Sequence, residues 1–78
     1  MLDEAKLKAV VATILEIDES QVDQNASMDS VESWDSIRHM DLILAIEEEF
    51  KVSVPDEEAA DLTSYPLIKL VVSELVGN

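Results

Sequence analysis

Residues 35–50 read DSIRHMDLILAIEEEF, and this stretch carries most of the information about the fold. On a helical wheel, at about 100° per residue, one face collects a mainly apolar set of side chains. The members of this set are His39, Leu42, Ile43, Ile46 and Phe50. The pattern predicts an amphipathic helix from Ser36 to Phe50 that buries this face in a core. Asp35 is suited to cap the helix, because its carboxylate can accept hydrogen bonds from unpaired backbone N–H groups.

The opposite face of this predicted helix mixes apolar side chains with acids. It holds Ile37, Met40, Asp41, Leu44 and Glu48, with Glu47 at its edge. A helix with one buried face is normally polar on the other. Two interpretations are open from periodicity alone. Either a neighbouring helix or loop covers the apolar stripe, or the face is a docking surface with an apolar centre and a charged rim.

Helical signals also flank this segment. Apolar side chains recur at helical spacing near the N-terminus and predict a helix over residues 3–16. The stretch Pro55-Asp56-Glu57-Glu58 predicts the start of a short helix that ends near Asp61, with Asp56 as its cap and acids in the first turn. A last helix is predicted over residues 66–76. Pro66 is a favourable first residue for it, because the N–H that proline lacks is not needed in the first turn.

Residues 17–35 form a long connection without helical periodicity. Connections of this length are usually functional or disordered. Apolar side chains scattered through it, such as Val22 and Trp34, favour an ordered loop that packs across helix ends. We therefore predict an all-α fold with three principal helices, one short helix and a long first loop, in a single domain over residues 1–78.

The composition restricts the possible functions. The formal net charge of −13 disfavours binding to nucleic acid or anionic lipid and favours protein partners with basic patches. The chain has no cysteine and one histidine, so neither a disulfide nor a transition-metal site is expected. Its longest apolar runs span only a few residues, and no signal peptide is recognisable. We expect a cytoplasmic monomer with no membrane span.

The tripeptide Asp35-Ser36-Ile37 resembles the Asp-Ser-Leu signature of acyl carrier proteins. The resemblance continues through the acidic helix that follows and through the segment Val-Pro-Asp-Glu-Glu at residues 54–58. The tripeptide alone is a weak motif, but the three features at this spacing are together specific. A second match, Asp29-Ser30-Val31, has no amphipathic helix after it, so Ser36 is the better candidate.

The resemblance implies a carrier and not an enzyme, with a small acyl-carrier-like helical bundle. In this family a phosphopantetheinyl transferase moves 4'-phosphopantetheine from coenzyme A to the serine, here Ser36, and the arm then holds acyl groups as thioesters. Asp35 is expected to contribute charge for transferase recognition. The helix after the serine is the family's main docking element, and the matching positions here are Ile37, Met40, Asp41, Leu44, Glu47 and Glu48.

Two residues depart from the familiar fatty-acid carriers. Arg38 stands where those carriers often have an acid, and it could pair with Asp35 or Asp41 or alter the choice of partner. Trp34 precedes the signature, as in specialised stand-alone carriers, and is expected to anchor the long loop. His39 is expected to have a packing or capping role.

Two alternatives remain beside an acyl carrier of fatty-acid, polyketide or related biosynthesis. An aminoacyl or peptidyl carrier would use the same serine and arm with a different cargo. A non-carrying acidic adaptor would explain the charge and the apolar stripe but would leave the placement of Asp35-Ser36 to chance. An enzyme is the least favoured class, because no nucleophile–base pair and no glycine-rich phosphate loop is present.

Overall fold

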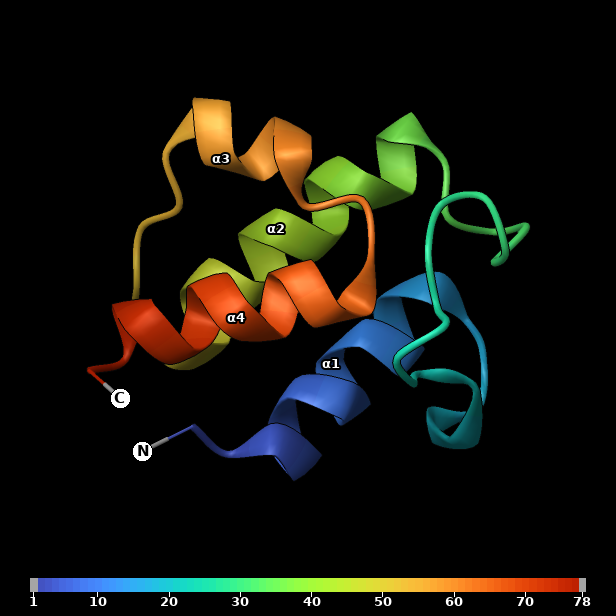
Figure 1. Ribbon diagram of the computed structural model, residues 1–78, viewed down its shortest axis with the longest axis horizontal. Helices are drawn as coiled ribbons and strands as arrows, with labels where there is room; N and C mark the ends of the chain where they lie inside the picture. The colour runs from blue at the N-terminus through green and yellow to red at the C-terminus, as the bar shows by residue number, and fades with distance from the viewer. Residues whose placement is uncertain (1, 78) are drawn as a thin grey trace.

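The computed structural model describes residues 2–77 and shows an all-α architecture (Figure 1). Its elements are α1 (Glu4–Leu15), a 3₁₀ turn η1 (Glu19–Gln21), α2 (Ser36–Phe50), α3 (Asp56–Asp61) and α4 (Tyr65–Leu75). In the view of Figure 1, α4 crosses in front of α2, with α1 below and the short α3 above. The predicted fold class, the bounds of α2 and the end of α3 at Asp61 are confirmed.

Local signals explain where α1 and α2 begin and end. Asp3 and Asp35 lie at the two N-caps, and each accepts a hydrogen bond at Oδ1 from a backbone amide three residues later. Both helices end at a residue in the left-handed conformation, Glu16 with φ 57° and Lys51 with φ 54°. Neither residue is glycine, so each ending carries a conformational cost of about 1 kcal/mol that tertiary contacts must offset.

The predicted cap of α3 is wrong. Asp56 is the first residue of this helix, and the N-cap position belongs to Pro55, which makes no side-chain cap. Pro55 has φ −57° and ψ 144°, an extended conformation that keeps it outside the helix. The carboxylate of Asp56 therefore acts through the helix dipole in the first turn. At the other end of the chain, α4 begins at Tyr65, one residue before the predicted start at Pro66.

One apolar core joins α1, α2, α4 and the long loop. Fully buried side chains come from each, including Leu7, Leu42 and Ile68 of the three helices. Burying a side chain of this size stabilises the fold by about 1.5–3 kcal/mol. On the predicted core face of α2, the aliphatic residues are buried, whereas His39 and Phe50 are only partly buried.

The long loop is ordered, as predicted. Val22 and Trp34 are buried with 0% and 2% of their surface exposed. Two backbone hydrogen bonds of 2.9 Å attach the loop to the chain around the start of α4, one from Met28 N to Thr63 O and one from Tyr65 N to Ala26 O. The ordered loop therefore holds Trp34 and the start of α2 in a fixed position at one end of the bundle.

Candidate attachment site and docking face

Ser36 is exposed at the first position of α2. The helical hydrogen bonds of α2 start with His39 N to Asp35 O at 2.8 Å, and the Arg38 amide bonds to Asp35 Oδ1 at 2.9 Å. The amides of Ser36 and Ile37 thus have no acceptor within the helix. Free amides and the positive end of the helix dipole favour a phosphate at this position. The predicted cap and the geometry at Ser36 therefore fit a phosphodiester on the serine hydroxyl.

Ser30, the serine of the second tripeptide match Asp29-Ser30-Val31, has a different environment. Its hydroxyl donates to Asn25 O at 2.8 Å and accepts from Ser27 N at 2.9 Å. It lies in a turn of the long loop and not at the start of a helix. These contacts give Ser30 a structural role in holding the loop.

The apolar stripe on α2 is uncovered. Ile37, Met40 and Leu44 are 74%, 68% and 58% exposed, which is high for large apolar side chains. Asp41 and Glu48 are exposed beside them. The interpretation in which a neighbouring helix or the loop covers this stripe is therefore wrong. An exposed apolar line with acids along its edge has the composition of an interaction surface.

Glu47, predicted to belong to the same surface, is partly buried and bound to the backbone before α3. Its Oε2 accepts a hydrogen bond of 2.7 Å from the amide of Val54, and the side chain is partly buried. Val54 lies just before α3, so Glu47 fixes the segment that leads into that helix. Sequence reasoning missed this contact, because the two residues are seven positions apart across a chain reversal.

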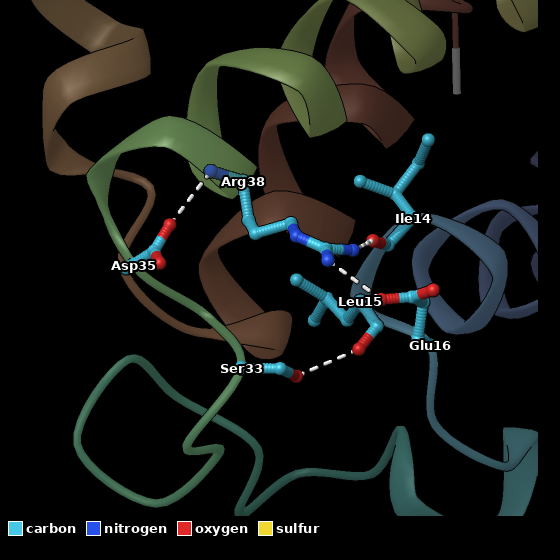
Figure 2. A network of polar contacts seen from close by, with 6 residues as sticks. All are labelled: Ile14, Leu15, Glu16, Ser33, Asp35 and Arg38. Atoms are coloured by element: carbon cyan, nitrogen blue, oxygen red, sulfur yellow. Dashed lines mark hydrogen bonds and ion pairs between the residues drawn. The ribbon is translucent and has the colours of Figure 1, made fainter.

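Arg38 does not make either predicted pair. Its guanidinium donates from Nη1 to Ile14 O at 2.8 Å and from Nη2 to Glu16 Oε2 at 2.6 Å (Figure 2). The side chain reaches across to the C-terminal end of α1, where unpaired carbonyls and the helix dipole attract a cation. The pairing with Asp35 or Asp41 expected from helical spacing is therefore wrong for the side chain of Arg38, although its backbone amide is the group that Asp35 caps.

Trp34 and His39 form a link that sequence reasoning missed. Trp34 anchors the loop as predicted, and its Nε1–H donates to His39 Nδ1 at 3.1 Å. His39 Nε2 lies 2.7 Å from the carbonyl oxygen of Ala59 in α3. The neutral imidazole with its proton on Nε2 satisfies both contacts at once. The only available signal was that a buried indole N–H needs an acceptor.

A cavity of about 320 Å³ lies between α2 and α3. The hydrogen bond between Glu47 and Val54 and the one between His39 and Ala59 both border it. His39 and Glu47 belong to its lining, together with apolar groups of Met40, Ile43 and Ala59. The two hydrogen bonds, to Val54 and Ala59, hold the chain at both ends of this cavity. The position of the six-residue α3 therefore depends on side chains of α2.

A second polar cluster lies between α1 and α4. The Tyr65 hydroxyl donates to Glu4 Oε2 at 3.1 Å, and Lys69 Nζ is 3.2 Å from Glu4 Oε1. Burial, and then the hydrogen bond to Glu4, raise the pKa of Tyr65 above its usual value. Hydrogen bonds from Lys69 and Tyr65 lower the pKa of Glu4. This cluster connects the first helix to the last.

Comparisons with known proteins point to one family. The family described as phosphopantetheine attachment site matches residues 5–66. An acyl carrier protein of Thermosynechococcus vestitus is 46% identical over 57 residues, which cover 73% of this chain and 70% of that protein. The chain belongs to the acyl carrier protein family. It is therefore a carrier of a phosphopantetheine arm that interacts with partner enzymes, and it is not itself an enzyme.

A solved structure shows the same fold. The solution structure of a holo acyl carrier protein from Geobacter metallireducens superposes with a TM-score of 0.84, covering 97% of this chain and 87% of that one. At 21% identity, this likeness concerns the fold of this carrier alone. In the part of the chain that the structure describes, no helix is long and apolar enough to cross a membrane.

Proposed function

We propose that the phosphopantetheine arm is attached to the hydroxyl of Ser36. In this reaction the Ser36 oxygen attacks the phosphorus next to the pantetheine half of coenzyme A. The bond to the other phosphate breaks, adenosine 3',5'-bisphosphate leaves, and the serine proton passes to a base of the transferase. The observation that carries the proposal is the exposed hydroxyl at the start of α2, beside two amides without helical acceptors. Once attached, the arm supplies a thiol for thioester formation, which the chain lacks because it has no cysteine.

We propose that the exposed face of α2 is where partner enzymes dock. Ile37, Met40 and Leu44 supply an apolar line next to the attachment site, and Asp41 and Glu48 supply negative charge at its edge. With a net charge of −13, this surface suits partners that carry basic patches around an apolar contact. Asp35, one residue before Ser36, adds a carboxylate for the transferase to recognise.

We propose that the cargo is an acyl intermediate of fatty-acid, polyketide or related specialised biosynthesis, carried by a cytoplasmic monomer formed of one domain. The similar protein named acyl carrier protein favours acyl over aminoacyl cargo. The Trp34-Asp35-Ser36 sequence, which resembles specialised stand-alone carriers, favours a pathway other than housekeeping fatty-acid synthesis. Loading by an adenylating enzyme with an amino acid, and no loading by an acyl-transferring enzyme, would instead identify a peptidyl carrier.

Attachment is tested by intact-protein mass spectrometry after incubation with coenzyme A and a broad-specificity phosphopantetheinyl transferase. Wild type and Ser30→Ala should each gain one phosphopantetheine, and Ser36→Ala should gain none. If Ser36→Ala still gains the group, the arm is attached elsewhere. A control carrier that the same transferase modifies excludes an inactive reagent.

Docking is tested by reversing charge on α2. Glu48→Lys should weaken binding to a loading or condensing enzyme and make the remaining affinity less sensitive to salt. Glu74→Lys makes the same change of charge at an exposed position of α4 and is the matched control. Equal losses in the two variants would show that net charge, and not the α2 face, determines binding.

A further inference from the structure

The C-terminal end of α1 is completed by side chains from another part of the chain. The helix ends at Glu16 in the left-handed conformation, and the carbonyls of Ile14 and Leu15 have no backbone partner among residues 2–77. Terminal carbonyls of this kind need a donor from elsewhere. Arg38 Nη1 donates to Ile14 O at 2.8 Å, and the Ser33 hydroxyl donates to Leu15 O at 2.7 Å (Figure 2). Both contacts are partly buried.

The two donors flank the attachment serine. Ser33 lies three residues before Ser36, and Arg38 lies two residues after it. Between them, Asp35 accepts the backbone amide of Arg38 at 2.9 Å. Figure 2 shows Ser33 and Arg38 both directed toward the end of α1, with Asp35 on the other side of the turn. The segment that carries Ser36 is therefore fixed to α1 on both sides of the serine. We call the contacts of Ser33 and Arg38 with α1 the α1 clamp.

The positive charge of Arg38 is stabilised by the C-terminal end of α1 and not by its own helix, α2. Arg38 lies in the first turn of α2, where the helix dipole disfavours a cation, and that turn contains no acid. At the end of α1 the dipole has the opposite sign and attracts the guanidinium. The ion pair with Glu16 at 2.6 Å adds to this attraction, although both side chains are partly exposed and solvent weakens the pair. The planar guanidinium can donate to Ile14 O and Glu16 together, which a lysine ammonium on a flexible stem does less well.

We propose that Arg38 is a positioning residue for phosphopantetheine attachment, acting through the α1 clamp. The clamp fixes the direction of the first turn of α2 and thereby the place of the Ser36 hydroxyl that the transferase must align with coenzyme A. A small misplacement of a reacting group lowers a rate strongly, so loss of the clamp should act on turnover. This inference rests on the proposed attachment at Ser36. It also separates Arg38 from the docking residues, because its guanidinium is bound within the chain.

The first test measures attachment kinetics with the phosphopantetheinyl transferase. Arg38→Met removes both donors while keeping a long side chain, and it should lower kcat about tenfold with little change in KM. Lys51→Met removes an exposed cation at the far end of α2 and is the matched control, with kcat unchanged. A change confined to KM would show that Arg38 contacts the transferase directly and would overturn the proposal, as would a kcat equal to that of wild type.

A charge exchange provides a second readout that a direct contact with the transferase would not give. Arg38→Glu alone should lower kcat, and the double variant Arg38→Glu with Glu16→Arg should recover part of it, because the ion pair returns with its sign reversed. Arg38→Lys should fall between wild type and Arg38→Met. No recovery in the double variant would argue against action through α1.

The amide signals of Ser36 and Ile37 in a nitrogen–proton NMR spectrum test the clamp without any enzyme. They should shift in Arg38→Met and, to a smaller extent, in Ser33→Ala, and stay in place in Lys51→Met and in Ser53→Ala, which removes an exposed hydroxyl beyond α2. Shifts of these signals with attachment still at full rate would overturn the positioning role. If Ser36→Ala retained attachment, the attachment proposal would fail, and the NMR shifts would still report on the clamp.

Discussion

Replacing His39 with leucine is the most informative test of how the structure holds α3. His39 accepts from Trp34 Nε1–H at 3.1 Å and donates to Ala59 O at 2.7 Å, joining the long loop, α2 and α3 through one ring. Leucine fills a similar volume but makes neither bond. The indole N–H of Trp34, which is 2% exposed, would then have no acceptor in the protein.

The expected cost follows from these contacts. A buried donor left without a partner costs about 1–3 kcal/mol. The carbonyl of Ala59 keeps its hydrogen bond from Leu62 N at 3.2 Å. Loss of its second hydrogen bond, from His39, therefore adds only about 0.5–1 kcal/mol. We expect His39→Leu to lower the free energy of unfolding by about 1.5–4 kcal/mol, which for a domain of this size corresponds to a fall in Tm of about 6–30 °C.

The assay is urea unfolding followed by far-UV circular dichroism, with a double-mutant cycle. Trp34→Phe removes the indole donor, so the combination with His39→Leu should be less damaging than the sum of the two single changes by at least about 0.5 kcal/mol. Met40→Ala, at an exposed position of the same helix, is the control and should cost less than about 0.5 kcal/mol. Strict additivity, or a cost of His39→Leu no larger than that of Met40→Ala, would show that the hydrogen bonds of His39 do not stabilise the fold.

Three further predictions concern charge. Glu47→Ala should lower stability by about 1–2 kcal/mol in urea unfolding, because its carboxylate accepts a backbone amide next to α3, whereas Glu48→Ala should be close to neutral; equal effects would contradict this. The hydrogen bond from Lys69 lowers the pKa of Glu4 below its ordinary value of 4.5. The stability that Glu4 contributes is therefore fully present above about pH 4.5 and is lost as the pH falls through the folded-state pKa. Wild type should therefore lose its advantage over Glu4→Gln on acidification, and an advantage that grew at low pH would reverse the sign. Raising NaCl from about 20 to 500 mM should raise Tm by screening the net charge of −13, and a falling Tm would show that the ion pairs outweigh the self-repulsion.

Features that depend on neighbours within one or two helical turns can be predicted from the amino-acid sequence alone. The apolar spacing in residues 36–50 is enough to specify α2, and Asp35 caps it three residues away. The same local pattern places Ser36 at a helix start and excludes that position for Ser30. Helical periodicity and capping both act over about four residues, which is the range in which a linear sequence can be interpreted. The prediction of the N-cap of α3 was wrong even though it lies within this range. Asp56 and Pro55 both suit a helix start, and only the backbone angles distinguish them.

The contacts between these elements depend on how the whole chain packs. Whether the stripe around Met40 is covered depends on where the other helices pack, and only the folded chain shows it exposed. Arg38 bonds to groups 22 and 24 residues away, and His39 to Ala59 across 20 residues. Helical spacing pointed Arg38 to nearby acids, but the unpaired carbonyls and dipole at the end of α1 offered a better partner once packing brought the two helix ends together. A long side chain can bond to any acceptor within its reach, and the acceptors near it are determined only once the core has formed.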